Sequence, residues 1–479
     1  MKFPILGVIV ATIYEIGRWV IRLTMLVIVP RRQQPSVATA WLLLVLFFPW
    51  LGGLLYFMVG ENRLPHRRLK KHARILKGLE TVNEGLKYRG QIHPDVAPAM
   101  EPVIKLAEKL GQFSIVGHNG VDVISGYENI IDRIIEDIDT AEEFVHLEFY
   151  IYANDEQGKR LSEALARATE RGAKCRVLVD AVGVRSFLGS LWGWMEERGI
   201  EIHEMLPASP FRMHVQRVDL RNHRKIVVID GQIAYTGSQN IINSDYGYNV
   251  AGLVYEELMV RLTGPVVHQL QAVFASDWYF ETDELLGAKY FPESTKTGTI
   301  PAQTLPSGPT YDMENFQRLV INMLYAAKER VVITTPYFLP DQQFMHAVET
   351  ARLRGVEIEV IVSQRDQLLV GLGQSAFYQD MLDAGVKIHK YMVALLHAKH
   401  MTIDDQIALI GSSNIDVRSM ALNFEVNVLF YGPKVVEMLQ VEHKRYIENS
   451  ELITLEEWNN RPFVERVIQD FAKLFSPLM

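Results

Sequence analysis

Hydrophobic residues are distributed in two different ways along this chain, and the difference sets its first sixty residues apart. Residues 37–60 contain no charged side chain, and a helix of that length could cross the ~30 Å hydrocarbon core of a bilayer. Residues 3–29 are also apolar but carry Glu15, Arg18 and Arg22 on one helical face. The pattern predicts a pair of membrane helices, the first of which either spans the bilayer or lies on its surface.

The basic residues around these segments predict their orientation. Only Arg31 and Arg32 lie between the two apolar stretches. A basic cluster follows the second stretch: Arg63, Arg67, Arg68, Lys70, Lys71, Arg74 and Lys77. Basic residues are enriched on the cytoplasmic side of membranes, so we expect the cluster and the domain behind it to be cytoplasmic. The cluster is either a site for anionic lipid headgroups or a solvated helix face.

After residue 110, short runs typical of strands alternate with stretches typical of helices, and the whole series occurs twice. Residues 145–155 match 332–341, and the strand run at 175–180 matches that at 358–363. The two series end at matching Gly-Pro pairs, Gly264-Pro265 and Gly432-Pro433. Alternating strands and helices predict the α/β class, here as two lobes of mixed sheet flanked by helices and related by a pseudo-twofold axis.

These patterns divide the chain into four parts. They are a membrane hairpin at 1–60, a basic linker at 61–110, a first lobe at 111–290 and a second lobe at 291–479. The lobe boundary falls in a stretch rich in Pro, Thr and Ser, which is typical of a linker. The last helix has apolar residues at helical spacing, which predicts packing on the second lobe, with contact to a membrane surface as the alternative.

Composition narrows the function classes. Hydrophobic residues make up 48% of the chain and charged residues 22%, so a large core is available. The net charge of −8 argues weakly against a nucleic-acid partner. The single cysteine, Cys175, excludes an intrachain disulfide framework and a thiolate cluster for zinc.

One short motif occurs once in each repeat. It reads His-x-Lys, four residues, Asp, six residues, Gly-Ser-x-Asn. Its members are His223, Lys225, Asp230, Gly237, Ser238 and Asn240 in the first copy and His397, Lys399, Asp404, Gly411, Ser412 and Asn414 in the second. One copy alone would be weak, but two copies with every spacing preserved make chance a poor explanation.

The residue types suit reactions at a phosphodiester. Two imidazoles can supply a nucleophile and a proton donor for the leaving alcohol. The lysines, with Ser238, Asn240, Ser412 and Asn414, can bind the phosphate oxygens. If His223 begins a strand, His223 and Lys225 share one face while Asp230 points to the other, so the aspartates are predicted to be structural anchors.

A nucleophilic imidazole also needs an acceptor for its second nitrogen. Glu257 and Glu425 each lie seven residues before the Gly-Pro pair of their repeat, so they are equivalent. We expect them to orient the histidines, the alternative being exposed carboxylates near a strand start. His397 and His400 have the spacing of metal ligands on a helix, but the segment is strand-like and the other copy has Ile226 in place of His400. We therefore expect no metal.

These residues resemble the phospholipase D superfamily, whose mark is the paired His-x-Lys motif followed by Gly-Ser-x-Asn. The run DLRNHRKIVVIDGQIAYTGSQNI is similar to bacterial cardiolipin synthases in particular. So are the N-terminal apolar pair and the segments RRQQPSVATAWLL and TPYFLPD. The resemblance covers nearly the full length. The superfamily often has Asp where Glu257 stands, which keeps a carboxylate but changes its reach.

The resemblance implies a metal-independent exchange that needs no cofactor. One histidine attacks the phosphate of a phosphatidylglycerol and releases glycerol, and a second phosphatidylglycerol takes the phosphatidyl group to give cardiolipin. By the same resemblance His223 is the nucleophile and His397 the general acid and then base, and the catalytic set is completed by Lys225, Lys399, Asp230 and Asp404. The alternatives are a phospholipase D hydrolase, a transferase that uses phosphatidylethanolamine as donor, and a non-catalytic membrane scaffold.

The partners implied are phosphatidylglycerol, other phospholipids and the membrane itself, with no nucleic acid. The implied location is the bacterial inner membrane, as a multi-pass protein with its catalytic domain in the cytoplasm. The sequence leaves the oligomeric state open.

Overall fold

The computed structural model describes residues 3–33, 35–60, 71, 90–185, 189–207, 219–246, 252–311, 314–364 and 368–473. The helices within residues 3–60 form one compact unit. The described residues from Lys71 onward, apart from 219 and 220, form the other. The predicted basic cluster, except for Lys71, lies outside the described residues, as does part of the predicted linker.

The N-terminal unit consists of α1 (Phe3–Arg32), α2 (Pro35–Phe47) and α3 (Pro49–Val59). Residues 37–60 are therefore two short helices and not the continuous helix that their apolar run predicts. Pro49 ends the first helix because it has no N–H to donate and its ring blocks the preceding turn. None of the described helices is both long enough and apolar enough to cross a bilayer, so the span predicted for residues 37–60 is not found.

The break between α2 and α3 is a tight turn held by two specific contacts. A Cβ at Gly52 would lie 2.9 Å from the Cα of Val45, so only glycine permits this approach of the two helices. The Arg22 guanidinium donates to the carbonyl of Leu46 at 2.8 Å, near the end of α2. The charge that interrupts the first apolar stretch thus satisfies a carbonyl that the helix break leaves without its usual donor.

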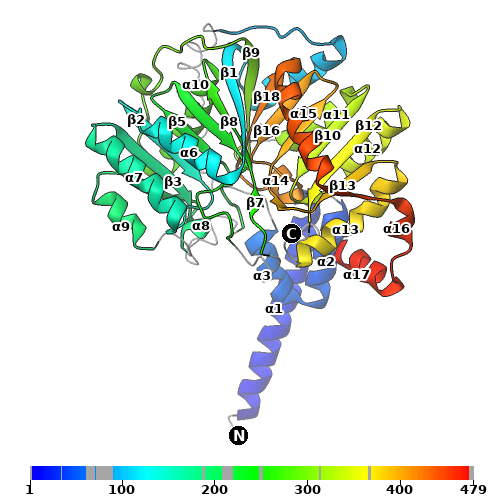
Figure 1. The fold of residues 1–479 in the computed structure, drawn as a ribbon. Helices are drawn as coiled ribbons and strands as arrows, with labels where there is room; N and C mark the ends of the chain where they lie inside the picture. The colour runs from blue at the N-terminus through cyan, green and yellow to red at the C-terminus, as the bar shows by residue number, and fades with distance from the viewer. Residues whose placement is uncertain are drawn as a thin grey trace. The chain divides into compact units, whose positions relative to one another are not determined.

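The described residues of the second unit, called the catalytic unit below, form one sheet of 15 strands (Figure 1). In the first half the order from the centre outward is β1, β8, β6, β5, β2, β3, β4. In the second half it is β9, β18, β16, β15, β10, β12, β13, with β19 added at the edge. The two halves are mirror images in strand order, and the antiparallel pair β1–β9 joins them. This confirms the predicted α/β class with two repeated lobes.

The sheet is mixed within each half. The outer strands β2, β3 and β4, and likewise β10, β12 and β13, are parallel, while the inner strands are antiparallel. The strands of the first half are β1 (Val116–Ser125), β2 (Phe144–Phe149), β3 (Lys174–Asp180), β4 (Glu201–Met205), β5 (Ile226–Ile229), β6 (Ile233–Gly237) and β8 (Leu258–Thr263). Those of the second half are β9 (Ile300–Ser307), β10 (Arg330–Thr335), β12 (Glu357–Ser363), β13 (Lys387–Tyr391), β15 (His400–Ile403), β16 (Ile407–Gly411), β18 (Glu425–Tyr431) and β19 (Ser450–Ile453). Two further pairs are small: β7 (Tyr255–Glu256) with β14 (Leu395–Leu396), and β11 (Phe338–Leu339) with β17 (Ile415–Asp416).

Helices cover both faces of the sheet, because neighbouring strand residues point to opposite sides and both sides are apolar. One face packs on α10 (Val266–Thr282) and α15 (Pro433–Glu448), which begin next to the Gly-Pro pairs. On the other face, α6 (Tyr127–Ile138), α7 (Glu156–Glu170) and α9 (Leu191–Glu196) cover the first half. There α5 (Glu101–Gly111), α11 (Asn315–Ala326), α12 (Gln342–Leu353) and α13 (Leu368–Asp383) cover the second half. Shorter elements are α8 (Ala181–Arg185), α14 (Val417–Ala421), α16 (Leu455–Asn459) and the 3₁₀ turns Pro98–Met100 and Ala288–Tyr290.

The last described helix, α17 (Phe463–Lys473), differs from its prediction. It is tied to α13 by an ion pair between Lys473 and Asp380 at 2.6 Å. Its large apolar side chains do not pack inward, however: Phe463 is 72% exposed and Phe471 62%. The helix therefore meets the second lobe through other residues and leaves its apolar face open to solvent.

Candidate active site

The two motif copies meet where the halves of the sheet join, and each is fixed to the opposite lobe. The His223 amide donates to the Phe424 carbonyl at 2.8 Å, just before β18. The His397 amide donates to the Glu256 carbonyl at 2.8 Å, in β7 of the first lobe. Each histidine therefore belongs to one repeat by sequence and is positioned by the other.

The side chains cross between the repeats in the same way. His223 Nδ1 lies 3.1 Å from Glu425 Oε2, and His397 Nδ1 lies 2.8 and 2.9 Å from the two oxygens of Glu257. Both glutamates are fully buried. Because each Nδ1 faces a carboxylate, each Nε2 is left for chemistry. The sequence nominates both glutamates, but spacing alone does not indicate that each serves the histidine of the other repeat.

Burial sets the charge of these pairs. It lowers the pKa of His223 and takes that of His397 to about 4, against the opposing attraction of the glutamates. Burial is the largest single influence on the pKa of Glu257 and Glu425 and would raise it, but the adjacent histidine, a motif lysine and a serine hydroxyl together outweigh burial, and both carboxyl pKa values are lowered. The resting arrangement is a carboxylate holding a neutral imidazole, which leaves a lone pair on Nε2.

The two motif lysines are buried beside the histidines. Lys225 Nζ donates to the His223 carbonyl and Lys399 Nζ to the His397 carbonyl, both at 2.7 Å. Burial lowers the pKa of Lys225 to about 7 and that of Lys399 to about 8, although nearby glutamates oppose the shift. Two buried ammonium groups so poorly solvated favour binding of an anion, and a phosphodiester supplies one.

The motif aspartates lie apart from the histidines. Asp230 accepts the backbone N–H groups of residues 142–144, and Asp404 accepts those of residues 328–330, at 2.6 to 2.9 Å. Each carboxylate thus fixes the start of a neighbouring strand, β2 or β10. This is the anchoring position that strand parity predicts for residues that the resemblance counts in the catalytic motif.

The motif serines and asparagines were predicted to bind phosphate, but the serine hydroxyls bond to the buried glutamates instead. The hydroxyls of Ser238 and Ser412 donate to Glu257 and Glu425, so they hold the carboxylates that hold the histidines. Asn240 Oδ1 accepts the Ile151 amide at 3.3 Å. A serine hydroxyl suits a phosphate and a carboxylate equally well, and only the fold decides between them.

The position of Asn414 is compatible with the predicted phosphate binding. Its Oδ1 is buried and has no hydrogen-bond partner within the described chain. A buried polar atom without a partner is costly, which is typical of a group that meets a ligand.

Two residues near the site, Arg224 and Ser419, could not be predicted from the spacing of the motif. Arg224 is 2% exposed, pairs with Asp277, and donates to the Glu425 carbonyl at 3.0 Å. Ser419 donates to Glu425 Oε1 at 2.9 Å. The only sequence signal for Arg224 is an asymmetry between the copies, since the second motif has Ala398 at that position.

His400 does not join the site. Its ring lies on β15 and its Nδ1 is 3.1 Å from Nε2 of His443, while His397 faces Glu257. The two histidines at metal-ligand spacing therefore have separate partners.

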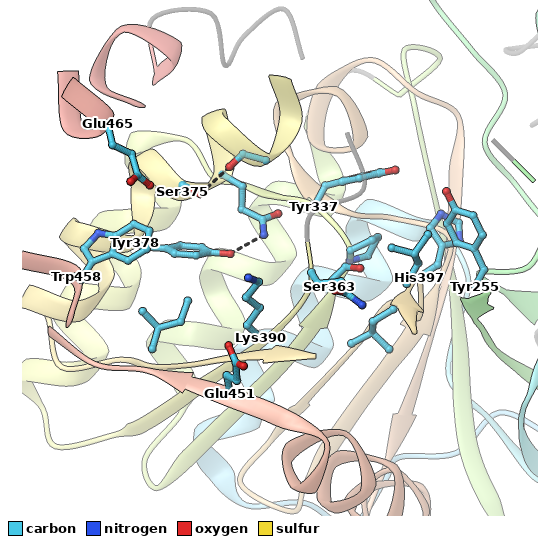
Figure 2. A pocket seen from close by; sticks show the side chains of 17 residues that line it. Tyr255, Tyr337, Ser363, Ser375, Tyr378, Lys390, His397, Glu451, Trp458 and Glu465 are labelled. Atoms are coloured by element: carbon cyan, nitrogen blue, oxygen red, sulfur yellow. Dashed lines mark hydrogen bonds between the residues drawn. The ribbon is translucent and has the colours of Figure 1, made fainter. Parts of the chain in front are cut away.

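A cavity of about 290 Å³ extends from His397 into the second lobe (Figure 2). Aromatic and polar side chains line it, among them Tyr255, Tyr337, Ser363, Gln374, Tyr378, Lys390 and Trp458. His223 is not part of this lining as described. The cavity is large enough to admit a polar group that reacts beside His397.

Comparison with known proteins agrees with this geometry. The family model described as "Cardiolipin synthase, PLD-like domain" matches residues 134–278 and 320–447, and a phospholipase D-nuclease N-terminal model matches residues 20–61. Cardiolipin synthase A of Proteus mirabilis is 35% identical over 95% of this chain and 95% of its own length. Cardiolipin synthase A of Serratia proteamaculans is 32% identical over 98% of this chain and 99% of its own.

A solved structure supports the fold independently. The crystal structure of phosphatidylserine synthase from Haemophilus influenzae superposes with a TM-score of 0.62, covering 78% of this chain and 99% of that one, at 15% identity. At that identity the likeness concerns the fold alone. The family match spans both lobes and the relatives match end to end, so this chain belongs to the cardiolipin synthase family of phospholipase D-like proteins.

Proposed function

We propose that the protein synthesises cardiolipin by transferring a phosphatidyl group from one phosphatidylglycerol to another. The observation that carries the proposal is the pair of buried neutral imidazoles, each held at Nδ1 by a carboxylate of the opposite repeat. Such a pair supplies one nucleophile and one proton carrier at a single phosphorus, and the relatives that match end to end are cardiolipin synthases.

In the first step His223 Nε2 attacks the phosphorus of phosphatidylglycerol. The bond from phosphorus to the glycerol oxygen breaks, and that oxygen takes a proton from His397, which leaves a phosphatidyl group on His223. Burial lowers the pKa of His397, but an adjacent phosphodiester anion raises it and favours the protonated form. Lys225 and Lys399 stabilise the charge that develops on the phosphorane oxygens.

In the second step the bond from His223 to phosphorus is broken by a second alcohol. A glycerol hydroxyl of another phosphatidylglycerol attacks phosphorus, and its proton passes to the neutral His397. Cardiolipin leaves, and the site returns to its starting state with one glycerol released per cardiolipin. Asn240 and Asn414 are proposed phosphate ligands, and Asp230 and Asp404 are proposed anchors.

We further propose that the enzyme works at the cytoplasmic face of the bacterial inner membrane. The helices α1 to α3 expose large apolar side chains: Ile13, Trp19, Leu23, Phe47, Leu51 and Phe57. The apolar face of α17 adds a similar surface to the catalytic unit. Surfaces of this kind bind lipid interfaces. Protease accessibility in sealed vesicles would test the side, and cysteine labelling along α1 and α2 would test whether either helix passes through.

The function is tested with purified protein and phosphatidylglycerol in mixed detergent micelles. We expect cardiolipin and glycerol in equal amounts, and no product from His223→Ala. Phosphatidic acid as the sole lipid product would contradict transfer and indicate a hydrolase. Release of ethanolamine from phosphatidylethanolamine, with no glycerol release from phosphatidylglycerol, would indicate the alternative donor.

A further inference from the structure

The cavity beside His397 is walled mainly by the second lobe, including its C-terminal segment, and Tyr255 of the first lobe also lines it. Ser363 ends β12, Tyr378 lies on α13, and Lys390 lies on β13. Figure 2 shows His397 at one end of the lining and Trp458 of α16 at the other. A cavity of about 290 Å³ has room for the six heavy atoms of glycerol.

Two hydroxyls in this wall have hydrogen-bonding capacity that the described protein leaves unused. Ser363 is 8% exposed, and its Oγ has no partner among the described residues. The Tyr378 oxygen accepts from Gln374 Nε2 at 2.6 Å. Gln374 Oε1 already accepts the Phe338 amide at 3.0 Å, so the orientation of this side-chain amide is determined. The phenol proton of Tyr378 is thus left to donate into the cavity.

Three charged side chains, Lys390, Glu451 and Glu465, also line the cavity. Lys390 is half-buried, and no described carboxylate lies within ion-pair distance of its ammonium group. Glu451 is its cross-strand neighbour on β19, and Glu465 lies on α17; both are exposed. Hydroxyl, amide, carboxylate and ammonium groups together suit a polyol, because each hydroxyl of a polyol both donates and accepts.

We propose that this cavity binds the glycerol headgroup of phosphatidylglycerol, as the departing alcohol in the first step and the attacking alcohol in the second. The proposal rests on the proposed function and adds the specificity of the alcohol site. Both alcohols occupy the position opposite His223, so one pocket serves both. One glycerol oxygen lies at phosphorus beside His397. The departing glycerol has two further hydroxyls, which reach Ser363 and Tyr378; the attacking headgroup has one further hydroxyl for these residues, because its third oxygen carries the phosphate of its own lipid.

Lys390 extends the pocket toward the rest of the accepting lipid. A phosphatidylglycerol acceptor carries its own phosphate on the far side of the glycerol, whereas free glycerol and water do not. The Lys390 ammonium group, which has no ion-pair partner among the described residues, is placed to meet this phosphate. The pocket therefore favours transfer to a lipid over hydrolysis by filling the alcohol site with glycerol and holding the second phosphate.

The test compares alcohols as acceptors from the same phosphatidyl-enzyme. Labelled glycerol gives labelled phosphatidylglycerol, propan-1-ol gives phosphatidylpropanol, and phosphatidylglycerol gives cardiolipin. Wild type should prefer glycerol to propan-1-ol. Tyr378→Phe and Ser363→Ala should each lower that preference by roughly five-fold, the effect of one lost hydrogen bond, with little change in the rate with propan-1-ol.

Lys390→Gln separates the two parts of the pocket. It should raise KM for phosphatidylglycerol as acceptor by about ten-fold and leave transfer to glycerol unchanged. Tyr325→Phe is the control, because Tyr325 is an exposed residue of α11 that does not line the cavity. It should not change the preference.

Each outcome bears on a different claim. An unchanged glycerol preference in both Tyr378→Phe and Ser363→Ala, with transfer intact, would overturn the pocket and leave the proposed function standing. A wild-type preference for ethanolamine over glycerol would overturn the polyol assignment. Hydrolysis without transfer to any alcohol in wild type would remove the proposed function and the pocket with it. The propan-1-ol rate reports whether a variant is folded.

Discussion

The two copies of the motif differ in how tightly they hold their histidine. His397 is held by both oxygens of Glu257 at 2.8 and 2.9 Å, and its side chain is 7% exposed. His223 is held by one oxygen of Glu425 at 3.1 Å, lies 3.2 Å from the Ser412 carbonyl, and is 14% exposed. Residues that are identical in sequence therefore occupy two different environments.

The glutamate of the less tightly held histidine, Glu425, has more supporting hydrogen bonds than Glu257. Glu257 accepts from Ser238 in addition to His397. Glu425 accepts from Ser412 and Ser419, and Arg224 holds its carbonyl. Of the two motif histidines, only His397 is among the described residues that line the cavity. A duplication can thus preserve one chemical pair while its surroundings make the two copies different, which is consistent with the proposed roles of the more accessible imidazole as nucleophile and of the one beside the cavity as proton carrier.

Replacing the histidines should have the largest effect and should separate these tasks. His223→Ala removes the nucleophile, so we expect no measurable turnover and no lipid bound to the protein. His397→Ala removes proton transfer, worth about 10²–10⁴-fold, and should slow both steps. Protein incubated with labelled phosphatidylglycerol and quenched in sodium dodecyl sulfate at mildly alkaline pH, where a bond from phosphorus to histidine is stable, measures the difference, because only His397→Ala should retain label.

The matched control is His400→Gln, which changes a histidine that faces His443 and not the site. It should retain wild-type turnover if it remains folded, as judged by thermal unfolding. Label on His223→Ala with none on His397→Ala would reverse the assignment of the two halves.

Replacing the carboxylates should have the next largest effect. Glu257→Gln and Glu425→Gln keep the shape of the side chain but remove the charge that orients Nδ1–H, so we expect kcat to fall on the order of 10²-fold or more. Glu257→Gln should cost more, because His397 loses two short contacts and Glu425 holds His223 by one longer contact. Steady-state kinetics on both variants make the comparison, and equal losses would contradict the difference between the halves.

The lysines should distinguish the halves by pH. Lys225, with a pKa of about 7, loses its charge before Lys399, with a pKa of about 8. The ammonium form exists below the pKa and is lost above it, so kcat/KM should fall as pH rises through about 7 to 8, up to roughly ten-fold per pH unit. Lys225→Arg keeps a charge at every pH and should move this fall toward pH 8, whereas Lys399→Arg should leave it near 7.

The diagnostic quantity is the pH at which the decline begins and not the absolute rate, because arginine does not replace lysine without loss. A decline at the same pH in wild type and both variants would show that neither lysine controls it.

Sequence periodicity predicts the two lobes but does not predict how they are joined. Alternating strand and helix runs, ending at Gly264 and Gly432, predict two lobes of one plan. Nothing in β1 or β9 marks them as partners, because strand pairing between distant segments depends on the assembled fold. The same reason hides the crossing of Glu257 to His397, since equal offsets establish equivalence and not contact.

The sequence pattern also did not determine the local structure of two further segments. Residues 37–60 have the composition of one long helix, but Pro49 and the close approach at Gly52 make two. Apolar residues on α17 have the spacing of a packing face, yet Phe463 and Phe471 remain exposed, since amphipathic spacing does not specify what covers the face.

Replacing the motif serines should have the smallest effect and tests the finest difference between the halves. If Ser238 and Ser412 act on the glutamates and not on phosphate, alanine at either position should lower kcat a few-fold and leave KM for phosphatidylglycerol unchanged. Ser238→Ala should cost more than Ser412→Ala, because Glu425 keeps the hydroxyl of Ser419 while Glu257 has no second serine among its described partners. The double variant Ser412→Ala with Ser419→Ala should then lower kcat as much as Ser238→Ala does, because Glu425 loses both serine hydroxyls. A rise in KM with constant kcat would instead place these hydroxyls on the phosphate, where the motif alone predicts them.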